Sequence, residues 1–336
     1  MKKTIILGAM VILGVVTSLI AIELGFRVLV PYIPNSKIPR SDRPRIYFFS
    51  EKSKSTHDYS YDEAKPEGTF RIVVIGDSFA YGYGNLFDDA FPKRLERILN
   101  LNDKATKVEV INLSNPGFST ADEAKRVNKI LKKWSPDLLM LEITLNDPEF
   151  KRFNPHEKRD KKGGIVLKGG IYDHWKSLAY VAGRIKNELS GYQTKRYYQD
   201  LWENKKNLAN FTVAFRDIID KVRSANVKFI AVIFPLLSFP LDDNYPFFHA
   251  HSIIQEYAKK FGAYSVDLYP NFANLDPYRL QAHPRLDPHP NEIAHRIAAE
   301  GIYFALVKHH LIPQDVKVRY MAHRRIGAVK LRKHKY

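Results

Sequence analysis

The chain contains no cysteine among its 336 residues, which excludes a disulfide framework and is compatible with either side of a membrane. It also has no repeat of fixed period and no stretch of low complexity, so a repeat architecture is not indicated. Apolar residues are plentiful, at 45% of the chain, which is enough for a large buried core. Short apolar runs alternate with helix-like segments, and this predicts one α/β domain with appended segments.

The N-terminus carries a long uncharged segment. From Thr4 to Ile22 the residues are mostly Ile, Leu, Val, Ala and Gly, close to the roughly 20 residues that a helix needs to cross a bilayer. A buried core helix would usually show a polar face, which this segment lacks. A cleaved signal peptide is the other alternative, with small residues at 16–18. The apolar run continues past them, which favours an uncleaved anchor over residues 1–22.

The orientation of this anchor is less strongly encoded. Lys2 and Lys3 favour a cytoplasmic N-terminus, whereas Arg27, Lys37 and Arg40 on the other side weigh against it. With the N-terminus inside, the domain that follows would be periplasmic or extracellular. We therefore expect a membrane-anchored protein whose main domain faces outward.

The formal net charge is +17, and part of it is concentrated in residues 313–336. Many Lys and Arg residues stand there against one acid, Asp315. A basic tail beside a membrane anchor predicts contact with anionic lipid headgroups, at about 1 kcal/mol per basic residue near the surface. A solvated, disordered tail is the alternative. No recognition motif for nucleic acid is present, so no nucleic-acid partner is expected.

Residues 23–68 are typical of a juxtamembrane connector, with several prolines and a polar end. From Arg71 onward the pattern alternates between strands and helices. It predicts an α/β domain over 69–312, with an insertion at 148–202, built on a doubly wound and mainly parallel five-stranded sheet. The predicted strands are 71–75, 107–113, 138–143, 228–234 and 264–268, and the predicted helices are 90–100, 120–134, 208–224, 251–261 and 291–309.

Ligands of such a sheet bind beyond the carboxyl ends of its strands, so the chemistry is expected there. Gly76-Asp77-Ser78 directly follows the first strand. A serine at a tight strand-to-helix turn can present its hydroxyl above the sheet and point its backbone N–H toward an oxyanion. Taken alone, the tripeptide is also compatible with an ordinary turn.

Two further loops follow strands. Gly117 follows the second strand, and its backbone N–H could approach a substrate closely; the alternative is a loop that leads to a helix cap at Ser119 or Thr120. Asn146 follows the third strand and could offer its side-chain amide to the same developing charge. The alternative for Asn146 is an ordinary Asn-Asp turn.

A histidine stands between two prolines near the C-terminus. His289 is held in a stiff loop, and neighbouring Asp287 could fix its tautomer and stabilise the imidazolium formed when it takes a serine proton. An exposed histidine before a helix capped by Asn291 is the alternative. Zinc would need a group such as His283, His289 and His295, but no paired spacing such as H-E-x-x-H occurs. No metal or other cofactor is therefore expected.

Together these motifs resemble the SGNH/GDSL hydrolase family, and the wider run from Gly76 to Leu95 resembles its members with an N-terminal membrane anchor. The resemblance covers about residues 71–309, and all the family's blocks occur in order. It implies a flavodoxin-like sheet and an ester hydrolase. The matching blocks are Gly76-Asp77-Ser78, Gly117, Thr144-Leu145-Asn146-Asp147 and Asp287-Pro288-His289.

The resemblance also implies residue roles. Ser78 would be the nucleophile, His289 the general base, and the N–H groups of Ser78 and Gly117 with the amide of Asn146 the oxyanion donors. The sequence departs from the family at Thr144, where glycine is usual. It departs again where the family's Asp, three residues before the histidine, is replaced by Leu286.

Asp287 stands two residues before His289, so either Asp287 orients the imidazole or a Ser-His dyad is assisted by a backbone carbonyl. The predicted reaction is hydrolysis of an acyl ester, with acetyl favoured, on an envelope glycan or lipid. Transfer of the acyl group to a sugar hydroxyl needs the same residues, and a catalytically silent binding or assembly protein is the third alternative. The aromatic residues of the insertion could stack on sugar rings or pack on the sheet; they are Tyr172, Trp175, Tyr180, Tyr192, Tyr197 and Tyr198.

Overall fold

The computed structural model describes residues 2–29, 58–101, 105–149, 174–284 and 287–316. The chain divides into two units, which are described separately. One consists of Met1–Pro44 with Phe153–Tyr197, and the other of Arg45–Arg152 with Tyr198–Tyr336. The predicted basic tail beyond residue 316, most of the predicted connector and Tyr172 lie outside the described residues.

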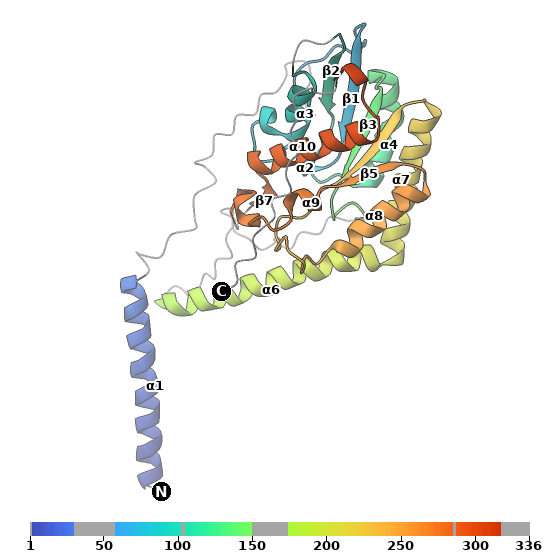
Figure 1. Cartoon of the computed structure of the whole chain (residues 1–336). Helices are drawn as coiled ribbons and strands as arrows, with labels where there is room; N and C mark the ends of the chain where they lie inside the picture. The colour runs from blue at the N-terminus through green and yellow to red at the C-terminus, as the bar shows by residue number, and fades with distance from the viewer. Residues whose placement is uncertain (1, 30–57, 102–104, 150–173, 285–286, 317–336) are drawn as a thin grey trace, which may run out of the picture. The chain divides into compact units, whose positions relative to one another are not determined.

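The second unit contains the sheet and its helices (Figure 1). Its strands are β1 (Thr69–Ile75), β2 (Lys107–Asn112), β3 (Leu138–Ile143), β4 (Lys228–Ile233), β5 (Tyr264–Asp267), β6 (Gln281–His283) and β7 (Asp287–Pro290). Its helices are α2 (Ser78–Tyr81), α3 (Phe91–Leu99), α4 (Thr120–Trp134), α7 (Lys205–Ser224), α8 (Phe248–Lys260), α9 (Tyr269–Phe272) and α10 (Glu292–Lys308), with the C-terminal end of α6 (Lys176–Glu203) and the 3-10 helices η3 (Phe87–Asp89), η4 (Pro277–Arg279) and η5 (Gln314–Val316).

Among the described residues, five parallel strands form the sheet in the order β2-β1-β3-β4-β5. Helices α3 and α10 pack together on one face, and α4 and α7 pack together on the other (Figure 1). The central strand β3 is buried along its whole length, as expected for a strand covered by helices on both faces. The predicted doubly wound α/β fold is therefore confirmed, and the carboxyl ends of the strands meet at one edge.

The structure contains two features that the sequence pattern did not predict. The C-terminal part of the predicted insertion forms the long helix α6. The stiff loop expected around His289 is instead the short strand β7, which pairs antiparallel with β6. Prolines 288 and 290 are tolerated because proline is accepted in edge strands, where a missing N–H costs no ladder hydrogen bond.

In the first unit, α1 (Lys2–Leu29) extends beyond the predicted apolar segment. Among the described residues it alone is long and apolar enough to cross a membrane, and this length and composition also fit a signal sequence. Near its end, the carboxylate of Glu23 accepts hydrogen bonds from Arg27 Nε and from the backbone N–H of Ser177, both at 2.8 Å. The one acidic side chain of the helix is thereby paired within its own unit.

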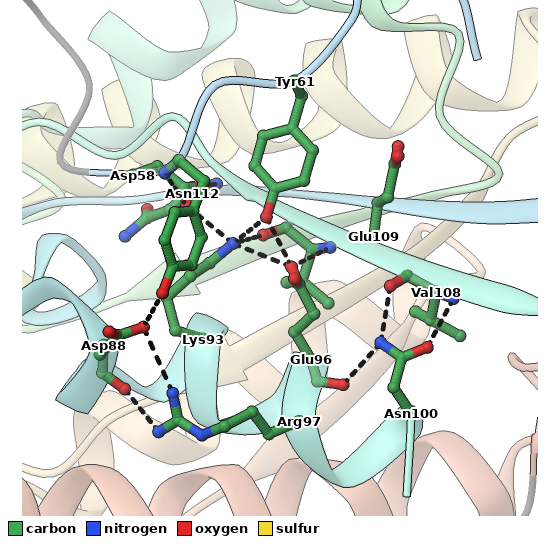
Figure 2. A network of polar contacts seen from close by, with 12 residues as sticks. Asp58, Tyr61, Asp88, Lys93, Glu96, Arg97, Asn100, Val108, Glu109 and Asn112 are labelled. Atoms are coloured by element: carbon green, nitrogen blue, oxygen red, sulfur yellow. Dashed lines mark hydrogen bonds and ion pairs between the residues drawn. The ribbon is translucent and has the colours of Figure 1, made fainter. Parts of the chain in front are cut away.

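The outer edge of the sheet, strand β2, is covered by side chains (Figure 2). Its outward N–H groups at residues 108, 110 and 112 donate to Asn100, Glu96 and Asp58, at 2.9, 2.7 and 2.7 Å. Lys93 donates to the carbonyl of Val110. An edge strand with unpaired backbone groups is a template for aggregation, and these side chains satisfy those groups.

A buried arginine of β1 forms hydrogen bonds with the residues that precede this strand. Arg71 is fully buried, and its guanidinium pairs with Glu109 at 2.8 Å. It also donates to the carbonyls of Asp62, Glu63 and Trp134, each at 2.9 Å. The guanidinium is thus supplied with acceptors on all sides, as a buried charge requires. Residues 62–63, within the predicted connector, are bound to the sheet by these contacts.

Candidate active site

The turn after β1 presents Ser78 at the carboxyl edge of the sheet. Asp77 caps α2, because its carboxylate accepts the N–H of Phe79 at 2.8 Å. Gly82 ends this short helix at φ 79°, a left-handed conformation that glycine adopts without strain. Ser78 is the first residue of α2, where backbone N–H groups have no partner within the helix. The turn therefore offers both a hydroxyl and a backbone donor on one side.

His289 and Ser78 are 211 positions apart in the sequence, and their side chains are in contact. Its Nε2 lies 2.9 Å from Ser78 Oγ, and its Nδ1 lies 2.6 Å from Asp287 Oδ1. The carboxylate also accepts the backbone N–H of His289 at 3.2 Å. The structure thus brings the three predicted catalytic residues into one hydrogen-bonded chain of serine, histidine and aspartate.

The unusual Asp-x-His spacing follows from strand β7. Side chains two residues apart in a strand point to the same face, so Asp287 and His289 lie side by side. In this chain the carboxylate at position 287 therefore has the geometry to orient the imidazole.

Aromatic rings enclose the imidazole on two sides. The ring centroid of Tyr83 lies 4.8 Å from that of His289, and the centroid of Phe79 lies 5.6 Å from it. The N–H of Tyr83 donates to Ser78 O at 3.0 Å, and Asn85 donates from its amide to the carbonyl of Pro290 at 2.7 Å. The residues just after α2 therefore hold the histidine strand and the serine turn in a fixed relation.

The two other predicted oxyanion donors follow the neighbouring strands. Gly117 lies in the loop after β2 at φ 74°; a side chain would be strained there. That loop is tied to the serine turn, because the N–H of Asn115 donates to Gly76 O at 2.9 Å. Asn146 follows β3, and the hydroxyl of Thr144 contacts its side-chain oxygen.

The departure at Thr144 has a structural consequence. Its hydroxyl also lies 2.9 Å from Asp77 Oδ2, and its backbone N–H donates to Asp147 at 2.7 Å. The glycine usual in the family has no hydroxyl for such contacts. In this chain Thr144 therefore links the turn that carries Ser78 to the loop that carries Asn146.

Behind the serine turn lies a group of buried acids, of which the sequence motifs include only Asp147. Glu123, Glu142 and Asp147 are all buried. Burial is the main cause that raises the pKa of each carboxyl well above its ordinary value, and the neighbouring carboxylate of Asp77 adds to it in all three. A sequence signal existed for Glu142, which is the one charged residue inside the apolar run of β3.

His283 and His295, the two other histidines considered for a zinc site, have partners other than Ser78. His295 is fully buried in α10, and its Nδ1 accepts the N–H of Phe91 at 3.2 Å. Burial lowers its pKa to about 3, so the ring stays neutral. His283 Nδ1 lies 3.2 Å from the carbonyl of Pro284. Across the described ranges, no group of three or more His, Cys, Asp or Glu residues could hold a metal ion.

The GDSL-like Lipase/Acylhydrolase family matches residues 74–297. An arylesterase of Vibrio mimicus is 30% identical over 84 residues, which are 25% of this chain and 41% of that protein. Among solved structures, that of TesA is 15% identical and covers 72% of this chain and 99% of its own, with a TM-score of 0.46. A catalytic mutant of Axe2, an acetylxylan esterase from Geobacillus stearothermophilus, is 12% identical over 70% of this chain and 94% of its own, with a TM-score of 0.48.

The family match covers most of the chain and includes both Ser78 and His289. The chain therefore belongs to the GDSL-like lipase/acylhydrolase family, as its motifs predicted. The match to the arylesterase spans less than half of that protein's length.

Proposed function

We propose that this chain is a serine ester hydrolase, and the observation that carries the proposal is the hydrogen-bonded series Ser78, His289 and Asp287. His289 Nε2 is placed to take the proton of Ser78 Oγ as that oxygen attacks an ester carbonyl. Asp287 holds the Nδ1–H tautomer and stabilises the imidazolium. The imidazolium then gives its proton to the leaving alcohol, and an acyl-serine remains.

Water completes the reaction. His289 removes a proton from a water molecule, the hydroxide attacks the acyl-serine, and the acid is released as Ser78 regains its proton. The oxyanion of both steps would rest on the N–H groups of Ser78 and Gly117 and the amide of Asn146. Each oxyanion donor of this kind contributes about 3 to 4 kcal/mol to stabilising the transition state. All three residues follow neighbouring strands at the same edge of the sheet.

The substrate we propose is an acyl ester, with acetyl favoured, on a glycan or lipid of the cell envelope. The apolar helix α1 supports this, since an uncleaved anchor would hold the hydrolase at a membrane. We propose that the second unit, which contains the sheet and Ser78 and is called the hydrolase unit below, lies on the periplasmic or extracellular side. Of the aromatic residues predicted to stack on sugar rings, Tyr198 packs edge-on against Phe247 at 6.1 Å, which favours a packing role for it.

The direct test uses the full chain in detergent with p-nitrophenyl esters of increasing acyl length. We expect hydrolysis that is fastest with acetate, and loss of it in Ser78→Ala. A panel of O-acetylated glycans and of lipid esters then identifies the alcohol. Adding a sugar acceptor separates hydrolysis from transfer, because transfer yields an acylated sugar in place of free acid. Equal inertness of wild type and Ser78→Ala across all acyl lengths would support a silent binding protein instead.

The aromatic contact to the histidine gives a further prediction. Tyr83→Ala should lower kcat roughly threefold to tenfold, because a pair of aromatic rings contributes about 0.5 to 1.5 kcal/mol beyond its buried area. Tyr83→Phe keeps the ring and should stay near the wild-type rate. The measurement is the steady-state rate on p-nitrophenyl acetate. A Tyr83→Ala enzyme as fast as Tyr83→Phe would show that the ring does not hold the imidazole.

A further inference from the structure

Glu142 is a buried acid in a strand that is otherwise apolar. It lies on β3, and only 1% of its surface is exposed. Since Ile75 of β1 pairs with Leu141, Glu142 lies level with Gly76, where the serine turn begins. A buried carboxyl group is costly unless it is bonded, so the contacts of this side chain indicate what it does.

The carboxyl of Glu142 supports the turn from below. Its Oε2 accepts the backbone N–H of Asp77 at 3.1 Å. A Cβ atom added to Gly76 would lie 2.6 Å from the same oxygen and 2.8 Å from the Cβ of Glu142. The carboxyl therefore fills the space against the backbone of the Gly-Asp-Ser motif, and this contact explains why the motif begins with glycine.

The surroundings of Glu142 favour the neutral form of its carboxyl. Oε1 is buried and has no hydrogen-bond partner in the described part of the chain, whereas a buried carboxylate is stabilised by several donors. The carboxylates of Asp77 and Asp147 act on it electrostatically and disfavour its ionised form. Glu123 of α4 adds a third buried acid, and Arg126 pairs with Glu123 at 3.7 Å. Burial and the negative neighbours raise the pKa of Glu142 well above its ordinary value.

The geometry points to Glu142 as a positioning residue, a neutral carboxylic acid that holds the Gly76-Asp77 turn so that Ser78 Oγ stays within reach of His289. This inference rests on the proposed function of Ser78 as nucleophile. Glu142, on β3, would help to hold the nucleophile in place without touching the substrate or the reacting atoms.

A consequence follows for the pH dependence of the reaction. When Glu142 ionises at high pH, its carboxylate is repelled by that of Asp77, and this repulsion moves the turn. The 2.9 Å contact between Ser78 and His289 would then be lost. The activity should therefore fall on the alkaline side through ionisation of Glu142.

The test is the rate at which a fluorophosphonate probe labels Ser78 in the full chain, measured by mass spectrometry from about pH 5 to 10 across the range where such groups titrate. Glu142→Gln keeps the shape and an oxygen for the Asp77 N–H, and it cannot ionise. We expect labelling near neutral pH within about threefold of wild type, since one neutral hydrogen bond is kept. We also expect the alkaline fall to be absent.

Glu142→Leu removes the acceptor. It should lower labelling roughly tenfold to a hundredfold at every pH, because a buried N–H is left unsatisfied. Asp137→Asn is the matched control, because it neutralises an acid just before the opposite end of the same strand, and it should keep the wild-type pH profile.

The thermal unfolding midpoint gives a readout independent of the serine. A raised pKa in the folded state means that the stability from Glu142 is lost as pH rises through that pKa, so wild type should lose more stability at alkaline pH than Glu142→Gln.

The outcomes are distinguishable. If wild type is labelled at Ser78 and Glu142→Gln shows the same alkaline fall, the inference about Glu142 is overturned while the proposed function stands. If wild type is not labelled at all, the proposed function fails, and the pH dependence of the unfolding midpoint still tests the neutral state of Glu142. A Glu142→Gln chain as poorly labelled as Glu142→Leu also contradicts the inference, since the conservative replacement should rescue the turn.

Discussion

Replacing Ser78 with alanine is expected to abolish ester hydrolysis, with kcat lower by about 10⁴- to 10⁶-fold, the range seen when a serine nucleophile or its base is removed. The reason is that Ser78 Oγ is the atom that lies 2.9 Å from the imidazole, and alanine leaves no nucleophile there. The measurement is kcat and KM on p-nitrophenyl acetate. KM should change far less than kcat, because the hydroxyl acts mainly in the transition state.

His289→Ala should give a loss of similar size, and the Ser78→Ala/His289→Ala double variant should be no slower than either single variant, because residues that act as a unit are not additive. Ser252→Ala, which removes a hydroxyl bonded to the α8 backbone, is the matched control and should keep full activity. The proposal is contradicted if Ser78→Ala retains a tenth or more of the wild-type kcat.

The sheet was predictable because its strands are encoded locally. Strands β1 and β3 are mainly apolar, with Arg71 and Glu142 as their charged residues, and the predicted bounds of β3 agree with those observed. The length and spacing of these runs allow few arrangements other than a parallel sheet with helices on both faces. Helix α6 was missed because its polar and aromatic residues show no clear apolar stripe, which is the signal by which a helix is recognised.

The site was predictable as far as the family motifs reach. Ser78 stood out because it directly follows a predicted strand, where such a sheet binds its ligands, and His289 because it stands between two prolines beside Asp287. The role of Asp287 was ambiguous in the sequence. Asp287 stands two residues before His289, and this spacing places the two side chains on one face only if the segment is a strand. Glu142 was visible only as a charged residue in an apolar strand, because its role depends on pairing across the sheet, from Ile75 to Leu141, and no local pattern records that register.

The polar network at the edge of the sheet was invisible in the sequence for the same reason. Lys93 is 1% exposed, and its ammonium lies 2.7 Å from Asp58 and 2.9 Å from Glu96 (Figure 2). It also donates to Tyr61 Oη at 2.6 Å. These residues come from two separate segments, so only the fold reveals that the lysine is buried among acids.

Lys93→Met is expected to destabilise the hydrolase unit by about 3 to 5 kcal/mol, the cost of leaving one partner of a buried ion pair uncompensated. Methionine fills most of the volume, so the effect reports the charge and the hydrogen bonds rather than a cavity. The free energy of unfolding is measured by denaturant titration of the full chain in detergent. Lys125→Met is the matched control: its ammonium is exposed and pairs with Asp122 at 2.9 Å, and such surface pairs contribute about 0 to 1 kcal/mol.

The loss in Lys93→Met should also depend on pH. Burial raises the pKa of Asp58 to about 6, and Lys93 lowers it against that trend, so removing the lysine raises this pKa further. Above about pH 6 the folded variant therefore binds a proton that folded wild type has released, and its stability relative to wild type falls as pH rises. Adding Asp58→Asn should restore part of the stability, because it removes the unpaired charge while keeping an acceptor for the N–H of Asn112. A Lys93→Met chain that loses less than 1 kcal/mol at every pH, or a double variant with no recovery, would show that the buried charge pair does not hold this edge together.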